Sequence, residues 1–144
     1  MKGLVVITGA SSGIGKELAV SFSREWHPVL LLARRKYLME ELNLENCICK
    51  SVDITKENEV KQAILEAEEK YGKTQLLINC AGIMLLGKPD TQNYDEWATM
   101  VDTNIKGILT GTSVVLPDMI KQNNGTIINI SSIAGRKTFD NHSV

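Results

Sequence analysis

Residues 5–15 read VVITGASSGIG, and this stretch decides the fold of the chain. A β-branched apolar run ends at Thr8, three glycines follow within seven residues, and a segment of helical spacing extends from Ile14 to about Trp26. A strand, a glycine loop and a helix in this order place backbone N–H groups and a helix N-terminus where they can bind phosphate. Glycine suits such a loop because a side chain would block the approach of the backbone or force a strained φ angle.

Two other interpretations of this loop compete with a nucleotide site. Glycines between a strand and a helix also serve as a tight turn with no ligand. A P-loop would use a Gly-Lys pair such as Gly15-Lys16, but it needs a Ser or Thr next to bind Mg²⁺. Glu17 stands there instead, which excludes the P-loop. The loop therefore predicts a dinucleotide site, with a purely structural turn as the alternative.

The composition is that of one globular domain. The chain has 144 residues, of which 43% are apolar and 23% charged, enough to bury a core. The net charge of −1, with the cations spread along the chain, predicts no nucleic-acid or membrane partner. No apolar run approaches the roughly 20 residues that span a bilayer, and the N-terminus resembles a core strand rather than a signal peptide. We expect a single cytoplasmic domain over residues 1–144.

The three cysteines are Cys47, Cys49 and Cys80. An odd number in apolar surroundings, without a C-x-x-C motif, predicts reduced thiols in a cytoplasmic protein. Cys47 and Cys49 would share one face of a strand, so a metal role stays open there. We nevertheless expect no metal site.

Apolar β-branched runs alternate with helical patterns along the whole chain. Near-continuous apolar strands separated by helices predict a parallel sheet covered on both faces. The right-handed crossover rule then favours a doubly wound Rossmann fold with strand order 3-2-1-4-5, and a ligand above the switch between strands 1 and 4. The predicted strands are Leu4–Thr8, Val29–Ala33, Cys47–Val52, Leu76–Cys80 and Thr126–Ile130, and the helices are Ile14–Trp26, Lys36–Leu42, Lys56–Tyr71 and Tyr94–Gln122.

Two helices show further signals. In the third, Thr55 is predicted to cap the start and Gly72 to end it. In the fourth, a polar Asn104 lies within an apolar stripe and should face the sheet, where its amide must find partners. The members of that stripe are Trp97, Val101, Asn104, Ile108, Val115 and Met119.

The end of the second strand carries a cofactor signal. A carboxylate at this point usually accepts a hydrogen bond from the ribose of NAD, but here Ala33 is followed by Arg34 and Arg35. Two guanidinium groups could pair with the 2′-phosphate of NADP. The alternative is that the two arginines belong to a solvated loop.

The chain resembles the short-chain dehydrogenases/reductases, and in particular their NADP-preferring members. Thr8-Gly9-x-x-x-Gly13-x-Gly15 is similar to the family's glycine fingerprint, and Asn79-Cys80-Ala81-Gly82 is similar to its Asn-Asn-Ala-Gly segment, with cysteine at the second position. Three further segments also occur in the family's order along the chain. They are Asp53-Ile54, between the two motifs above, and then Val101-Asp102-Thr103-Asn104 and Ser131-Ser132.

The resemblance implies a cofactor site with one part of the dinucleotide at each strand end. The glycine loop would hold the pyrophosphate, Ser11, Ser12 and Arg34 the 2′-phosphate, Asp53 and Ile54 the adenine, and residues 79–82 the ribose. Asp53 could alternatively begin the next helix as an N-terminal anion. The full cofactor set implied is Gly9, Ser11, Ser12, Gly13, Ile14, Gly15, Arg34, Arg35, Asp53, Ile54, Asn79, Cys80, Ala81 and Gly82.

The resemblance also implies a catalytic site that oxidises an alcohol or reduces a carbonyl by hydride transfer. Ser132 would orient the substrate, and Asn104 would order a water or simply make a structural hydrogen bond. The family's Tyr-x-x-x-Lys motif would begin immediately after Val144, so residues 140–144 resemble the approach to it. We expect an inactive fragment of a homo-oligomeric reductase, with a noncatalytic NADP-binding module as the alternative.

Overall fold

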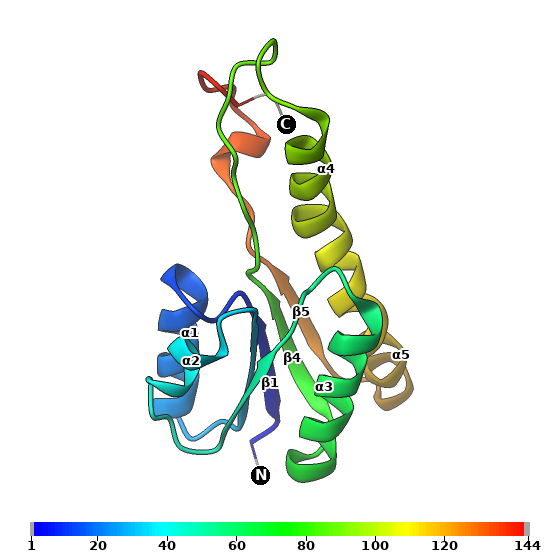
Figure 1. The fold of residues 1–144 in the computed structure, drawn as a ribbon. Coiled ribbons are helices and arrows are strands. Elements are labelled where there is room, and N and C mark those ends of the chain that lie inside the picture. The colour runs from blue at the N-terminus through cyan, green and yellow to red at the C-terminus, as the bar shows by residue number, and fades with distance from the viewer. Residues whose placement is uncertain (1, 143–144) are drawn as a thin grey trace.

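A computed structural model describes residues 2–142 of the chain as a five-stranded parallel sheet with helices on both faces (Figure 1). The strand order is β3-β2-β1-β4-β5, as predicted. Of the predicted approach to the catalytic helix, Ser143 and Val144 lie outside the described residues. The strands are β1 (Leu4–Thr8), β2 (Val29–Ala33), β3 (Cys47–Ser51), β4 (Thr74–Asn79) and β5 (Thr126–Asn129).

Strand β1 lies at the centre of the sheet, with every residue buried. It pairs with β2 on one side, where Ile7 aligns with Leu31, and with β4 on the other, where Ile7 aligns with Ile78. Strands β2 and β3 therefore extend the sheet on one side of β1. The chain then crosses back, and β4 and β5 extend the sheet on the other side. The carboxyl ends of β1 and β4 adjoin at this switch, where open parallel sheets bind their ligands.

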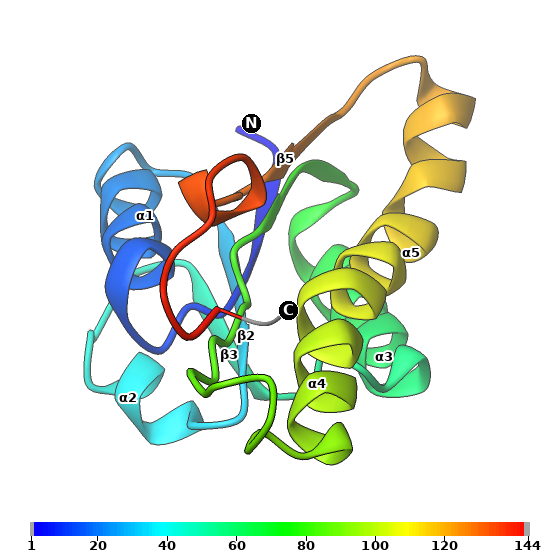
Figure 2. The ribbon, with the colours of Figure 1, turned by 90° about the horizontal axis from the view of Figure 1, so that it is seen from above.

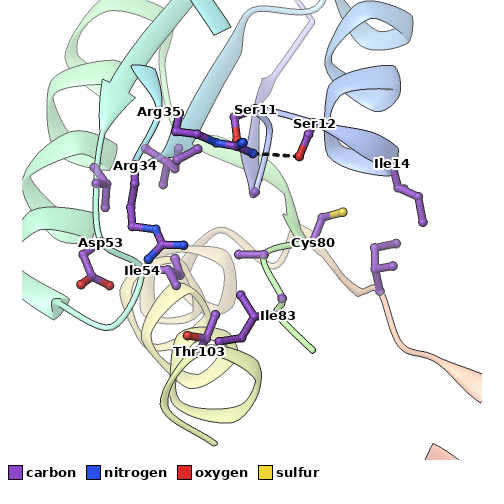
Figure 3. A pocket seen from close by; sticks show the side chains of 17 residues that line it. Ser11, Ser12, Ile14, Arg34, Arg35, Asp53, Ile54, Cys80, Ile83 and Thr103 are labelled. Carbon is purple, nitrogen blue, oxygen red and sulfur yellow. Dashed lines mark hydrogen bonds between the residues drawn. The ribbon is translucent and has the colours of Figure 1, made fainter. Parts of the chain in front are cut away.

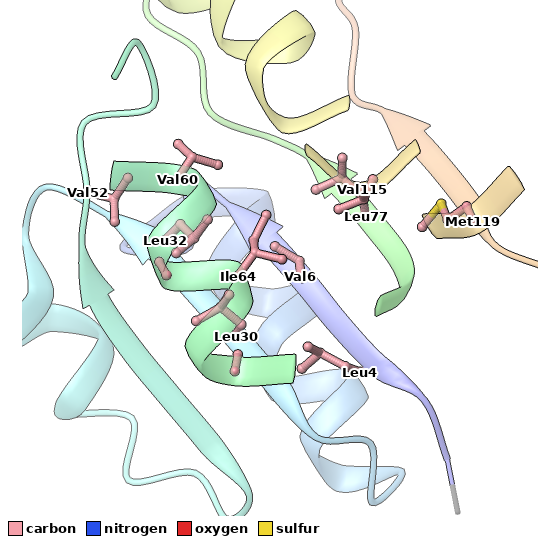
Figure 4. Packing of buried hydrophobic residues seen from close by; sticks show 12 residues of the cluster. Leu4, Val6, Leu30, Leu32, Val52, Val60, Ile64, Leu77, Val115 and Met119 are labelled. Carbon is pink, nitrogen blue, oxygen red and sulfur yellow. The ribbon is translucent and has the colours of Figure 1, made fainter. Parts of the chain in front are cut away.

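Helices cover the two faces in separate groups (Figures 1 and 2). Alternate strand side chains point to opposite faces, so each face has its own apolar cluster. Figure 4 shows the cluster under α3 and α5, to which Val6, Ile64 and Val115 contribute. The helices are α1 (Gly13–Arg24), α2 (Lys36–Glu40), α3 (Glu57–Tyr71), α4 (Tyr94–Val101) and α5 (Gly107–Gln122), with a π-helical turn η1 (Asp102–Lys106) and a 3₁₀ turn η2 (Ile133–Gly135).

The predicted single helix over residues 94–122 is interrupted by η1. A π turn adds one residue to the helix and shifts the buried stripe by one position on its N-terminal side. Met100 is accordingly buried at 3% exposure, whereas Val101 of the predicted stripe is exposed at 36%. The prediction was wrong at Val101 and right at Val115 and Met119, which are buried.

The start of α3 also differs from its prediction. Lys56 precedes the helix without a side-chain cap, and the Thr55 hydroxyl donates to Asp53 Oδ1 instead, at 2.8 Å. Thr55 therefore holds the loop before the helix rather than capping the helix. The C-terminal prediction is confirmed, because Gly72 ends α3 with a φ of +83°. Among the described residues no helix is long and apolar enough to cross a membrane.

Candidate functional site

A pocket of about 530 Å³ opens at the carboxyl ends of the strands (Figure 3). Its walls come mainly from the end of β2 and the loops that follow β1, β2, β3 and β4, with Thr103 of η1 and Ile130 after β5, so segments far apart in sequence meet there. The volume is in the range of small-molecule sites. Eleven of the fourteen predicted cofactor-binding residues line it: Gly9, Ser11, Ser12, Ile14, Arg34, Arg35, Asp53, Ile54, Cys80, Ala81 and Gly82.

The remaining predicted residues lie near the pocket without lining it. These are Gly13, Gly15 and Asn79 of the cofactor set, and Asn104 and Ser132 of the catalytic set. Six lining residues were missed by the sequence analysis: Leu32, Ala33, Val52, Ile83, Thr103 and Ile130. Most of them are apolar residues at the strand ends. In the sequence they look like the rest of the apolar strand, so nothing marks them as pocket residues.

The glycine loop is shaped by contacts within the protein. A Cβ atom on Gly15 would lie 2.6 Å from the backbone oxygen of Gly9. Gly9 has a φ of +69°, and a Cβ there would lie 2.7 Å from Cα of Ala81. These two glycines allow the loop to fold against itself and against the end of β4. The space beside Gly13 is open within 4 Å.

Thr8 joins the two loops at the switch of the sheet. Its Oγ1 accepts hydrogen bonds from the backbone N–H groups of Cys80 and Ala81, both at 3.0 Å. Thr8 is buried at 1% exposure, so its hydroxyl is available to these groups and not to solvent. Thr8 was predicted as the end of a strand and the first residue of the glycine fingerprint, and its hydrogen bonds to the loop after β4 were not predicted.

Arg35 reaches from the loop after β2 to the glycine loop. Its Nη2 donates to the hydroxyl oxygens of Ser11 and Ser12, at 3.2 Å each (Figure 3). The two hydroxyls thus hold a guanidinium group over the loop. Arg34 lies on the other side, close enough to Asp53 to contribute to lowering its pKa. The loop after β2 therefore presents two cations and no carboxylate to the pocket.

Asp53 is held by the residue that was predicted to cap α3. Its Oδ1 accepts from the backbone N–H and the hydroxyl of Thr55, at 3.0 and 2.8 Å. These bonds, together with the nearby cations Lys56 and Arg34, keep the pKa of Asp53 below its ordinary value. The side chain is therefore an oriented carboxylate at neutral pH, available as a hydrogen-bond acceptor.

Cys80 and Asn79 end the fourth strand with different surroundings. Cys80 lines the pocket, and burial raises the pKa of its thiol despite a hydrogen bond from the backbone of Gly15. Asn79 is buried at 2% exposure, and its Nδ2 donates to Asn129 Oδ1 at 2.9 Å. Asn79 therefore braces β4 against β5 and is placed inside the sheet rather than on the pocket wall.

Asn104 lies in η1 and bonds to the segment that follows β4. Its Nδ2 donates to the backbone oxygen of Ile83, and its Oδ1 accepts from the backbone N–H of the same residue, both at 2.8 Å. The structural hydrogen bond expected for Asn104 is thus present. The neighbouring Thr103 reaches the pocket from the same π turn. Such turns are frequent at functional sites.

Ser132 is exposed just beyond β5. Its Oγ accepts a hydrogen bond from the backbone N–H of Ala134 at 3.1 Å, which leaves the hydroxyl proton free to be donated. The chain's three tyrosines are in α2, α3 and α4, and none of them lines the pocket. The described residues contain no cluster of three or more His, Cys, Asp or Glu side chains that could hold a metal ion.

A doubly wound parallel sheet, with a glycine loop and a pocket at its switch point, defines a Rossmann-type domain. The chain belongs to the short-chain dehydrogenase family, whose model matches residues 3–144. It is 40% identical to an uncharacterized oxidoreductase of Staphylococcus saprophyticus and 38% identical to one of Listeria monocytogenes. Each match covers 98% of this chain, which spans only 59% of the length of either relative.

Solved structures give the same family. Serine dehydrogenase from Escherichia coli superposes with a TM-score of 0.91 at 30% identity, covering 98% of this chain and 67% of that one. A structure described as ElxO with NADP bound has a TM-score of 0.87 at 33% identity, covering 99% and 60% of the two chains. The chain is thus an oxidoreductase-family domain whose relatives extend well beyond the matched region.

Proposed function

We propose that this chain is the cofactor-binding part of an NADP(H)-dependent oxidoreductase that interconverts a small alcohol and its carbonyl compound. The carrying observation is the pair of cations after β2, with Arg35 held over the glycine loop by Ser11 and Ser12. An arginine there favours the 2′-phosphate, because guanidinium groups make charge-assisted hydrogen bonds to phosphate oxygens. The relatives being oxidoreductases supports an enzyme over a noncatalytic binding module.

The shape of the pocket suits such a cofactor. Ser12 and Ile14, on either side of the first residue of α1, both line the pocket, so a pyrophosphate there would lie near the helix N-terminus. Asp53 and Ile54 would receive the adenine, because an oriented carboxylate beside an apolar side chain can bond an amino group and pack a ring. Cys80, Ala81 and Gly82 would lie against the ribose. ElxO and serine dehydrogenase, the latter complexed with NADP⁺, have been solved with this class of cofactor.

The bound nicotinamide would supply or accept the hydride. The chain's own residues would then position the reactants. Ser132, with its hydroxyl proton free, would donate a hydrogen bond to the substrate oxygen. Asn104 would fix the wall of the site through Ile83 and order a water beside it.

We further propose that residues 1–144 bind the dinucleotide but do not catalyse hydride transfer. The family's Tyr-x-x-x-Lys motif does not occur in this sequence, and general acid catalysis of that kind contributes about 10²–10⁴-fold. An NADPH-oxidation assay against a panel of carbonyl compounds checks this. Turnover by the 144-residue chain would refute the assignment of the proton donor to a Tyr-x-x-x-Lys motif.

The cofactor proposal is tested by titrating NADPH and NADH against the chain and following reduced-nicotinamide fluorescence. We expect tighter binding of NADPH, and a loss of roughly 1.5–3 kcal/mol of NADPH binding energy in Arg35→Gln. NADH binding should change little in that variant. Arg24→Gln, an equal charge change in the exposed last turn of α1, is the matched control. Equal curves for the two cofactors in the unmodified chain would refute the NADP preference.

We also propose that the protein is cytoplasmic and forms homo-oligomers. Ile105, Leu109, Leu116 and Ile120 form an exposed apolar stripe along η1 and α5, and this supports self-association. Light scattering of Leu109→Lys beside the unmodified chain tests the assembly. A monomer of the unmodified chain at high concentration would contradict it.

A further inference from the structure

Cys47 and Cys49 form a pair of thiols on β3, at the edge of the sheet opposite to β5. Their sulfur atoms are 3.6 Å apart, and both side chains are half-buried against the apolar cluster of the α1 and α2 face. The pair is separate from the dinucleotide pocket, which neither cysteine lines. Nothing in the proposed function uses it.

The spacing of the sulfurs fits a shared metal ion. Two thiolates bound about 2.3 Å from one ion are about 3.8 Å apart at a tetrahedral angle and about 4.6 Å apart in a linear arrangement. Residues i and i+2 of a strand have Cα atoms about 6.6 Å apart, so small side-chain rotations of Cys47 and Cys49 reach either arrangement. The same Cα separation is at the upper limit for a disulfide, which would have to bend the strand.

The two thiols lie against each other and beside an ion pair of α2. The two sulfur atoms are joined by a hydrogen bond, so one thiol proton lies between them. Lys36 and Glu40 of α2, paired at 2.9 Å, both lie within electrostatic range of Cys49, and their charges oppose each other there. A metal ion can take the place of the shared proton, with the protons released to solvent.

The ligand set selects the kind of ion. Soft thiolates favour Cu(I) and Zn(II) among the available ions, and Zn(II) structural sites need four ligands. The described residues supply no cluster of three or more His, Cys, Asp and Glu groups. We propose that Cys47 and Cys49 form a two-thiolate site for a soft monovalent cation of the Cu(I) class.

The experiment is an anaerobic competition titration of the full chain with Cu(I) against the chromophoric chelator bicinchoninate. We expect one Cu(I) per chain and a loss of affinity of about 100-fold or more in Cys47→Ser and in Cys49→Ser, because each variant loses the second, intramolecular ligand. Cys80→Ser removes the chain's remaining thiol and should stay within about threefold of the unmodified chain.

A second measurement needs no variant. Cu(I) should protect Cys47 and Cys49 from iodoacetamide, as read by peptide mass spectrometry, and leave Cys80 unprotected. Equal protection of Cys80, or affinities of both strand variants within threefold of the unmodified chain, would overturn the proposal. NADPH titration of Cys49→Ser keeps this result separate from the proposed function, since its cofactor binding should be unchanged.

Discussion

The side-chain amide of Asn104 makes both of its hydrogen bonds to the backbone of one residue, Ile83, each at 2.8 Å. Beyond the end of β4, the amide bonds both backbone groups of Ile83, as the backbone of a neighbouring strand would. Because Ile83 lines the pocket, the π turn η1 sets the position of one pocket wall.

The substitution Asn104→Ala should make the pocket wall at Ile83 more mobile. Removing two hydrogen bonds at a part-buried site should lower the free energy of unfolding by about 1–3 kcal/mol. The Ile83 amide should also exchange its hydrogen faster, which NMR can measure. Asn124→Ala, at an exposed asparagine between α5 and β5, is the control. Unchanged exchange at Ile83 would contradict the role of Asn104.

The substitution Thr8→Val tests what the hydrogen bonds of Thr8 contribute to stability, apart from the space that its side chain fills. Valine fills nearly the same space but leaves the N–H groups of Cys80 and Ala81 unpaired, at a cost of about 2–4 kcal/mol in the free energy of unfolding. NADPH affinity should fall as well, since both residues line the pocket. Thr126→Val, on the exposed end of β5, should be nearly neutral in urea denaturation. Equal stability of the two variants would argue against the bridging role.

Gly15→Ala should destabilise the glycine loop. The new Cβ would be 2.6 Å from the backbone oxygen of Gly9, and overpacking of this kind costs about 1–3 kcal/mol. Gly135→Ala has no atom within 4 Å of its new Cβ and serves as the matched control. Thermal unfolding measures both. If Gly15→Ala unfolds at the same temperature as Gly135→Ala, the close packing of the loop is not needed for stability.

Thr55→Val should raise the pKa of Asp53 toward its ordinary value. The variant loses the hydroxyl hydrogen bond and retains the backbone one, so the return should be partial. A carboxylate whose pKa is lowered by folding contributes stability above its unfolded pKa, and this is lost as the pH falls through the folded pKa. The variant should therefore lose less stability on acidification than the unmodified chain.

NMR titration of the Asp53 carboxyl carbon measures this shift directly. Thr91→Val is the control, because the Thr91 hydroxyl donates to the backbone oxygen of Lys88 and not to a carboxylate. An Asp53 pKa that is the same in Thr55→Val and in the unmodified chain would show that the hydroxyl does not set it.

The sheet order and most of the pocket could be predicted from sequence because both follow from strand ends. Continuous apolar runs such as Val29–Ala33 mark the strands, and a parallel sheet collects the residues after each strand at one edge. Arg34 and Arg35 therefore reached the pocket as expected.

The features that were missed depend on contacts between distant segments. The π turn at Asn104 breaks the 3.6-residue period, so counting helical positions placed Val101 inside and overlooked Met100. The Thr55 hydroxyl bonds to Asp53 and does not cap the helix. Loop geometry decides between these two roles, and the spacing of residues in the sequence does not give that geometry. Thr8 binds residues more than 70 positions away, and a strand pattern alone gives no sign of that.

The central position of β1 has a consequence for how the chain is made. Leu4 pairs with Thr74, so about 70 residues must be synthesised before β1 can acquire its second neighbour. At roughly 5–20 residues per second this takes about 4–14 s on the ribosome. During that interval a strand that is fully buried in the finished domain has one open edge, and chaperones that bind short apolar segments have an opportunity there.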